Sequence, residues 1–523
     1  MLTRPGRSLL AWRPLTLGTV FALGLVAGAV PTVPVSAAAH PSASAHPSAS
    51  VRPSTSTQRN AIVADDDLLT YGYDNGRSGH DPADLAMKGL SSAPAWNDDS
   101  LDGAVFGEPL VYGSTVYVGT ENDSLYAISA TTGHVLWKLH VGAAVSLFSV
   151  VDSAPTLNSG CGNINPLGIT GTPVIDPSTN EIFLAEETET AGRADWEHIQ
   201  FWLVAISLVT HHELWHRDID PPHGNNGSFY YVPAEQQRPA VTLLDGRLYV
   251  PFGGLIGDCG QYHGYLVDLP ESGKGPLQSY QVPTQREGAI WETNGALVSP
   301  QGDLYVATGN GSSNSVAHFD EGNSVVELSP SLGRLGYWAP SNWVKLNDED
   351  WDLGSGGPIQ VPGTSLLFIA GKPAQNASYG YLMREGHLGG IGKGAFTGEV
   401  CTGGGVFGAD ASDVLGSPNK ARVLIYAPCG GGTVALQIDA STMSFKRVWS
   451  STGSPNGPPI VAAGLVWALD WDNGKLYGMN PGTGQTVVER ATGSLNHFAT
   501  PGVGDQMLLV PTQGGVEAFR ISV

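Results

Sequence analysis

A repeated pattern of short apolar runs constrains the fold of this chain more than any other feature of its sequence. In residues 111–137, β-prone runs alternate with turns rich in Gly, Asn and Asp, as expected for one small antiparallel sheet. One strand of this unit recurs in eight copies spaced 41 to 66 residues apart, with the central residues Tyr117, Phe183, Tyr249, Tyr305, Phe368, Tyr426, Trp467 and Leu509. The repeat predicts an all-β fold, an eight-bladed β-propeller. Seven blades, with one copy misassigned, is the alternative.

The final repeat is incomplete. Residues 516–523 supply only the third strand of the last sheet, so its outer strand must come from elsewhere in the chain. We expect the segment around Ala95 and Trp96 to supply it, because that pairing closes the ring and leaves no free sheet edge. The composition of 69 Gly, 36 Pro and only 14% charged residues agrees with short strands and tight turns.

The first part of the chain has the pattern of an export signal. An apolar run over residues 15–30 is preceded by three arginines, Arg4, Arg7 and Arg13. Small residues follow the run at 35–37. We predict a signal peptide over 1–37, a disordered Ser/Ala/Pro-rich linker over 38–64 and the propeller over 65–523. The expected location is secreted or the exterior of the cell envelope, with no membrane span after signal removal; an uncleaved anchor is the alternative.

Charge and cysteines narrow the partners and the cofactors. A net charge of −22 repels phosphate backbones, so no nucleic acid partner is expected. The four cysteines allow three pairings, and the repeat register favours Cys161 with Cys259 and Cys401 with Cys429 because it puts each pair in neighbouring loops. Free buried thiols are the alternative. No haem is expected, because the CxxCH attachment pattern is absent from the sequence.

The long loops of the predicted propeller share one face. Loops that follow second strands and loops between blades open on the same side, and this rule places insertions at 186–200, 218–237 and 310–323 together. Function is expected on that face. A match to the zinc-protease pattern HExxH at His212 to His216 is expected to be fortuitous, because the segment should be a strand rather than a helix.

In its middle blades the chain resembles the pyrroloquinoline quinone (PQQ) repeat proteins, which include quinoprotein alcohol dehydrogenases. The similar segments are residues 288–291 with 303–311, and the acidic segment 348–352. The resemblance implies that Trp291 lies beneath the quinone, that Asn310 binds its calcium ion, and that Asp350 or Asp352 is the catalytic carboxylate. Lys372 takes the place of a basic residue that contacts the quinone oxygens.

These residue types suit the chemistry that the resemblance implies. A flat aromatic ring supports a planar cofactor, the oxygens of Asn310 and Asp352 suit calcium, and a carboxylate can take the proton of an alcohol. The sequence departs from the dehydrogenases where they carry two adjacent cysteines and an arginine, since 159–166 contains only Cys161. Near the expected calcium-binding glutamate only Asp258 is present, as an offset substitute.

Two kinds of function follow. The chain is either a PQQ-dependent and calcium-dependent enzyme that oxidises an alcohol or sugar, or a non-catalytic binding or assembly scaffold that has lost the quinone. Its expected partner is accordingly a small molecule, a glycan or an exported protein. The structural alternative is that Trp291 only packs between blades and that Asn310 is only a turn residue.

Overall fold

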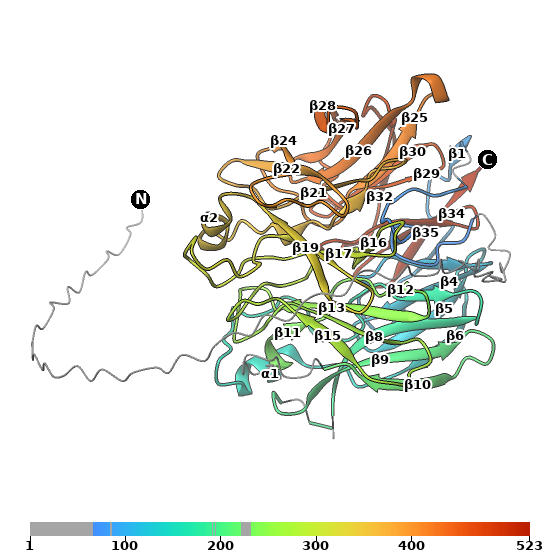
Figure 1. The fold of residues 1–523 in the computed structure, drawn as a ribbon. Helices are drawn as coiled ribbons and strands as arrows, with labels where there is room; N and C mark the ends of the chain where they lie inside the picture. Colours follow the sequence, from blue (N-terminus) through green and yellow to red (C-terminus); the bar gives the residue numbers. More distant parts are fainter. Residues whose placement is uncertain (1–65, 84–85, 191, 194, 221–231) are drawn as a thin grey trace, which may run out of the picture. The chain divides into compact units, whose positions relative to one another are not determined.

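The computed structural model describes residues 66–523 apart from 84–85, 191, 194 and 221–231 (Figure 1). The predicted signal peptide and linker lie outside these residues. The described residues form eight mainly antiparallel sheets, which are arranged as the blades of a propeller. Eight blades are therefore confirmed, and the seven-bladed alternative is wrong.

The first four blades run from residue 110 to residue 339 and have these strands in chain order: β3 (Leu110–Tyr112), β4 (Thr115–Thr120), β5 (Ser124–Ser129) and β6 (Val135–His140); β7 (Val174–Asp176), β8 (Glu181–Glu189), β9 (Ile199–Ser207) and β10 (Glu213–Asp218); β12 (Thr242–Leu244), β13 (Arg247–Gly254), β14 (Tyr265–Pro270) and β15 (Gln278–Gln281); and β16 (Leu297–Val298), β17 (Leu304–Ala307), β18 (Val325–Leu328) and β19 (Arg334–Ala339). Two short strands extend these sheets, since β11 (Glu235–Gln236) pairs with β13 and β23 (Gly390–Ile391) runs parallel to β19.

The remaining four blades are built in the same way from these strands: β20 (Ile359–Gln360), β21 (Leu366–Ala370), β22 (Ala377–Arg384) and β24 (Phe396–Thr402); β25 (Ala411–Leu415), β26 (Arg422–Cys429), β27 (Gly432–Asp439) and β28 (Ser444–Ser450); β29 (Ile460–Ala462), β30 (Leu465–Asp470), β31 (Lys475–Met479) and β32 (Thr486–Ala491); and β33 (Gly502–Gly504), β34 (Met507–Pro511) and β35 (Val516–Ser522). The eighth blade takes its outer strands, β1 (Gly89–Leu90) and β2 (Trp96–Asp98), from the beginning of the propeller.

The eight marker residues of the repeat all lie on the second strand of their blade, and none is more than 5% exposed. The apolar core is continuous between neighbouring blades, because large side chains on the second and third strands pack against the next sheet. Removing these apolar faces from water is the main stabilising contribution to the ring.

The ring closes as the sequence predicted. Trp96 pairs with Ala518 of β35, and its indole N–H donates a 2.7 Å hydrogen bond to the carbonyl oxygen of Ala130 in the first blade. This single side chain therefore connects the last blade to the first.

Both predicted disulfides are present. Cys161, in the connection between the first two blades, is bonded to Cys259, which follows β13. Cys401 on β24 is bonded to Cys429 at the end of β26, so this bridge joins the fifth and sixth blades. The described residues contain no free cysteine.

Two expectations about local structure had different outcomes. Residues 186–200 were expected to form a loop, but β8 and β9 continue pairing as far as Glu189 and Ile199, so much of that insertion is strand. The segment from His212 to His216 lies on the outer strand β10, as predicted, and the imidazole of His216 contacts the Glu213 carboxylate of its own strand at 2.7 Å. This geometry does not place the two histidines on one metal.

Helices are few and short. They are α1 (Leu147–Ser153), α2 (Trp343–Asp348) and the 3-10 turns η1 (Val232–Ala234), η2 (Leu353–Ser355) and η3 (Pro418–Lys420). Within the described part of the chain, none is both long and apolar enough to cross a membrane.

Candidate functional site

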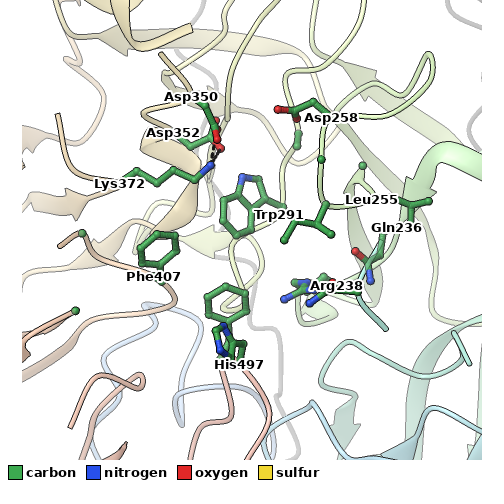
Figure 2. A pocket seen from close by; sticks show the side chains of 18 of the residues that line it. Gln236, Arg238, Leu255, Asp258, Trp291, Asp350, Asp352, Lys372, Phe407 and His497 are labelled. Atoms are coloured by element: carbon green, nitrogen blue, oxygen red, sulfur yellow. Dashed lines mark hydrogen bonds and ion pairs between the residues drawn. The ribbon is translucent and has the colours of Figure 1, made fainter. Parts of the chain in front are cut away.

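A cavity of about 480 Å³ is lined by segments of seven consecutive blades, the second to the eighth (Figure 2). Its walls come from residues that either precede the first strand of a blade, such as Trp291, or follow the second strand, such as Lys372. These are the loops that the repeat register places on one face. The sequence predicted a site in the middle blades, and the structure shows a cavity that seven blades share.

Lys372, Asp350 and Asp352 form a compact charged group on one wall. The ammonium of Lys372 lies 2.5 Å from Oδ1 of Asp350 and 2.7 Å from Oδ2 of Asp352 (Figure 2). Lys372 follows β21, whereas the two aspartates lie between α2 and η2, before the first strand of the same blade. The predicted catalytic residues are therefore brought together by one blade.

Asp352 is the buried member of this group. Its side chain is 9% exposed, compared with 62% for Asp350, and its Oδ1 accepts a 2.5 Å hydrogen bond from the backbone N–H of Asn310. Burial raises the pKa of Asp352 to about 6, against the lowering effect of Lys372. The same two carboxylates raise the pKa of Lys372 although burial opposes its charge.

Asn310 joins the acidic group through both its backbone and its side chain. Its amide Nδ2 donates to Oδ1 of Asp350 at 3.0 Å, and its Oδ1 accepts from Asn323 at 3.1 Å. Gly309 precedes it because a Cβ there would lie 2.8 Å from Oδ1 of Asp352 and 3.2 Å from Nε1 of Trp291. Close packing on both sides of Asn310 therefore requires the two glycines, since a Cβ on Gly311 would lie 2.5 Å from the Asp320 carboxylate.

Trp291 forms a flat surface in the middle of the cavity. Lys372 Nζ lies 5.7 Å from its ring centroid, within the range of a cation–π contact. On its other side the ring of Phe498, from the eighth blade, meets it edge to face at 6.0 Å. Trp291 is only partly buried and lines the cavity, so it does more than pack between blades.

Asp258 also lines the cavity but does not join the charged group through a direct bond. Its Oδ1 accepts a 2.6 Å hydrogen bond from the hydroxyl of Tyr262, four residues along the same loop. In Figure 2 it lies apart from Asp350, Asp352 and Lys372. Its negative charge nevertheless contributes to the raised pKa of Asp352.

Sequence reasoning missed Arg238, which lines the same cavity beside Phe498. Its guanidinium lies 5.0 Å from the Phe498 ring centroid, and its one side-chain hydrogen bond to a described residue is a long one, 3.4 Å, to Oδ1 of Asn163. The residue is 9% exposed and forms no ion pair with any described carboxylate. Burial lowers its pKa to about 10, and Glu121 opposes that shift. The sequence did contain one indication of this residue. Arg238 precedes the innermost strand of its blade, at a point where most other copies of the repeat have small residues.

The predicted metal ligands do not form an open donor set. The oxygens of Asp352 are engaged by the Asn310 N–H and by Lys372, and the Asn310 amide oxygen by Asn323.

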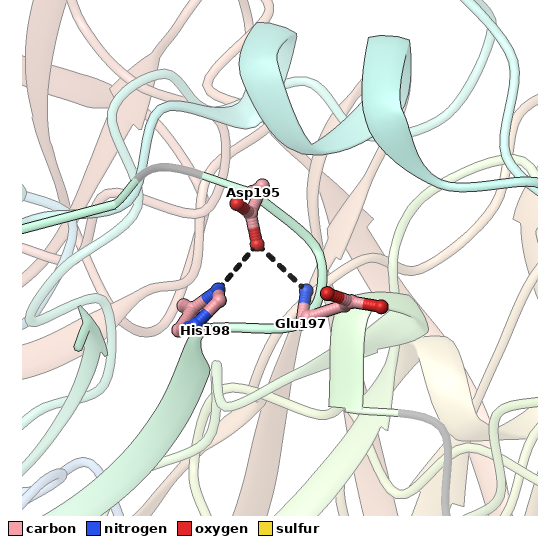
Figure 3. Close-up of side chains that lie close together, drawn as sticks. All are labelled: Asp195, Glu197 and His198. Carbon is pink, nitrogen blue, oxygen red and sulfur yellow. Dashed lines mark hydrogen bonds and ion pairs between the residues drawn. The ribbon is translucent and has the colours of Figure 1, made fainter. Parts of the chain in front are cut away.

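Among the described residues, one group of three side chains has metal-type ligand atoms within 4.8 Å of one another, and it lies elsewhere: Asp195, Glu197 and His198 (Figure 3). Asp195 is already paired with Arg193 at 3.0 Å and with the His198 imidazole at 2.6 Å. The Asp195 carboxylate is therefore already paired within its own surface loop, and the three residues do not line the cavity.

Comparison with known proteins agrees with the repeat and the fold. Residues 85–226 match the profile of a family described as "Outer membrane protein assembly factor BamB". A polyvinylalcohol dehydrogenase of Sphingopyxis sp. (strain 113P3) is 22% identical over 288 residues, which is 50% of this chain and 37% of that protein. The match thus spans little more than a third of the length of this curated relative.

Solved structures share the fold at low sequence identity. The quinohemoprotein alcohol dehydrogenase of Comamonas testosteroni is 14% identical with a TM-score of 0.59, covering 88% of this chain and 81% of that one. A europium-containing methanol dehydrogenase is also 14% identical with a TM-score of 0.59, covering 87% of this chain and 98% of that one. The predicted resemblance is confirmed at the level of the fold: the described residues form a β-propeller like that of the quinoprotein alcohol dehydrogenases, and residues 85–226 match a family of PQQ repeats.

Proposed function

We propose that the cavity binds a planar, carboxylate-bearing quinone of the PQQ type and that the protein oxidises an alcohol or sugar with it. The observation that carries this proposal is the placement of two cations on either side of an aromatic surface. Lys372 lies over Trp291, Phe498 meets Trp291 edge to face, and Arg238 lies over Phe498 (Figure 2). The names of the two dehydrogenases that share the fold support the same chemistry.

Arg238 is the part of the cavity that most requires an anionic ligand. Arg238 is only 9% exposed, forms no ion pair with a described carboxylate, and is stabilised as a cation by Glu121 at longer range. A buried charge in this state is costly unless a ligand pairs with it. A guanidinium recognises carboxylates through two parallel hydrogen bonds. Arg238 comes from the third blade, whereas the dehydrogenase arginine would fall near Cys161, so this chain would hold the carboxylates from a different loop.

The remaining residues of the site have roles that follow from their contacts. Trp291 would support one face of the ring system and Lys372 would contact the quinone oxygens. When bound, the quinone supplies the two-electron acceptor for the alcohol. The Asp352 carboxylate would accept the hydroxyl proton, and with a pKa of about 6 it is mostly ionised at neutral pH. The Lys372 ammonium and the Asn310 N–H hold that carboxylate in a fixed orientation.

Calcium is not part of this proposal. The donor atoms expected to bind it are already satisfied by protein groups, and the positive charge beside Asp352 is supplied by Lys372. The export to the cell exterior that the first 37 residues predict would place the site where small alcohols or glycans are accessible. That location remains part of the proposal.

The test is to titrate PQQ into the purified protein, with and without calcium, and to follow tryptophan fluorescence and dye reduction with a panel of alcohols and sugars. We expect binding, and we expect Arg238→Met to weaken it by about tenfold or more. Arg422→Met, at an exposed position at the start of β26, is the matched control and should bind as the parent does. An uncharged ortho-quinone such as 9,10-phenanthrenequinone should not distinguish Arg238→Met from the parent.

No PQQ binding at about 100 µM would overturn the proposal, because the cavity would then not recognise the cofactor class. Binding without turnover of any alcohol or sugar would favour the alternative function, a propeller that binds a ligand without oxidising anything.

A further inference from the structure

A second cavity of about 360 Å³ lies immediately behind the charged group, between the fourth and fifth blades. Residues from β19, α2, the 350–352 segment and the β22 and β24 strands form its walls. The described residues that the argument uses are Trp338, Ser341, Asn342, Trp351, Gln375 and Tyr379. None of the residues assigned to the proposed cofactor site lines this second cavity.

The two cavities share two backbone segments. Trp351 faces the second cavity, while its neighbours Asp350 and Asp352 line the first. On the adjacent loop, Lys372 lines the first cavity and Gln375 the second. The cavities are therefore separated by little more than the thickness of one chain.

Backbone geometry at both shared segments is unusual. Asp350 has a φ of 54° and Gln375 a φ of 67°, a left-handed conformation that residues with a side chain rarely adopt. Each such residue costs on the order of 1 kcal/mol and tends to persist where surrounding structure or a ligand requires it.

The chemistry of the lining favours a neutral ligand with many hydroxyl groups. Aromatic side chains provide flat surfaces, including Trp351, which is partly buried, and Tyr379, which is 39% exposed. Between them, Ser341, Asn342 and Gln375 offer hydrogen-bonding groups without charge. Aromatic surfaces with a few neutral polar groups suit the alternating C–H and O–H faces of a sugar or polyol.

The second cavity has one charged side chain among the described residues of its lining. No carboxylate is found among the described residues of its lining, and its one cation, Lys345, lies 4.8 Å from the Trp351 ring centroid in a cation–π contact. The indole N–H of Trp338 is buried and has no acceptor among the described residues.

We propose that this second cavity is an accessory site for a neutral polyhydroxylated ligand, a short saccharide or a polyol chain. The site takes its ligand between the Trp351 and Tyr379 rings and does not depend on whether the first cavity holds a quinone. A ligand there contacts Trp351, which lies between Asp350 and Asp352 in the chain. We therefore expect ligand binding in the second cavity to affect the charged group of Asp350, Asp352 and Lys372.

The experiment uses isothermal titration calorimetry of the full mature protein with four probes: cellotetraose, maltotetraose, chitotetraose and a vinyl alcohol oligomer. We expect at least one probe to bind, with Trp351→Ala and Tyr379→Ala each weakening its affinity about tenfold or more. Phe148→Ala, which removes an aromatic side chain that is 66% exposed on α1, is the matched control and should leave that affinity within about twofold. Thermal unfolding checks that each variant is folded. If Trp351→Ala is not folded, the Tyr379→Ala variant, at an exposed position, provides the test on its own.

Two outcomes overturn the inference. One is the absence of binding by all four probes at about 10 mM. The other is binding that neither Trp351→Ala nor Tyr379→Ala weakens, which would put the ligand elsewhere. The Arg238→Met variant distinguishes this inference from the proposed function, because it should lose PQQ affinity and keep polyol affinity.

Discussion

The ammonium of Lys372 lies 2.7 Å from Oδ2 of Asp352, and the backbone N–H of Lys372 donates to the carbonyl oxygen of Asp352 at 2.8 Å. Two residues separated by 20 positions are thus joined through both their side chains and their backbones. The pair holds the loop before the first strand of the fifth blade against the loop after its second strand. Any change to either residue is therefore expected to alter the protonation of the other.

Replacing Lys372 by methionine should raise the pKa of Asp352 above its value of about 6, because the cation that lowers it is removed while its burial remains. If Asp352 is the base of an alcohol oxidation, it would be ionised only at higher pH. We expect the acidic limb of the pH profile of kcat/KM to move upward by about one unit. Lys372→Arg, which keeps the charge, should leave the limb close to its original pH. If the acidic limb of the pH profile stays at its original pH in Lys372→Met, Asp352 is not the base of the reaction.

Asp352→Asn should separate the catalytic role of this carboxylate from ligand binding. The amide cannot accept the hydroxyl proton, so we expect turnover to fall by about 10²-fold or more. PQQ affinity, measured by fluorescence, should fall no more than about threefold, because Trp291 and Arg238 are untouched. Asp348→Asn, an exposed aspartate that does not line the cavity, is the control. Equal loss of turnover in both variants would rule out a specific role for Asp352.

The buried carboxyl groups predict that stability falls as pH rises. Burial raises the pKa of Glu108 to about 8 and that of Glu121 to about 7, both from an ordinary value of 4.5. Because the folded protein keeps these protons at a pH where the unfolded chain has lost them, the free energy of unfolding decreases from about pH 4.5 to about pH 8.

The measurement is thermal unfolding between pH 5 and pH 8. Each carboxyl should contribute on the order of 1 kcal/mol or more to the decrease. Glu108→Gln should make the decrease smaller, since glutamine does not titrate and can still accept the Gly72 N–H. A midpoint that is constant across this range, or higher at pH 8, would show that these groups are ionised in the folded protein.

Trp96→Ala should destabilise the propeller by roughly 3–5 kcal/mol, as expected for truncation of a large buried aromatic residue. Trp96 is 8% exposed, pairs with the last blade and donates to Ala130 in the first, so its loss weakens the closure of the ring. Chemical denaturation measures the effect, with Asn97→Ala, an exposed neighbour on β2, as control. A decrease below about 1 kcal/mol would show that closure depends on the backbone pairing of β1 and β2 instead.

Much of the architecture was predictable from the sequence because each blade repeats the same local pattern. Recurring short apolar runs separated by turns rich in Gly, Asn and Asp identified all eight second strands, from Tyr117 to Leu509. Knowing which strand each residue occupies also determines the face of every loop, which is why the pairing of Cys401 with Cys429 could be predicted. The gathering of Trp291, Asn310, Asp352 and Lys372 followed from the same register together with the family resemblance.

What the tertiary structure decided is how distant blades meet around one cavity. Arg238 and Phe498 are 260 positions apart, yet the guanidinium of one lies over the ring of the other, because closing the ring brings the third and eighth blades to opposite sides of the same space. No local pattern contains that relationship. The sequence by itself determined the register of the repeated strands and the face on which the long loops lie, and it predicted the eight blades that the structure confirms, since these depend on short-range periodicity. Which charges face each other across the cavity, and that Lys372 occupies the position between Asp350 and Asp352, depended on packing between segments that are remote in sequence.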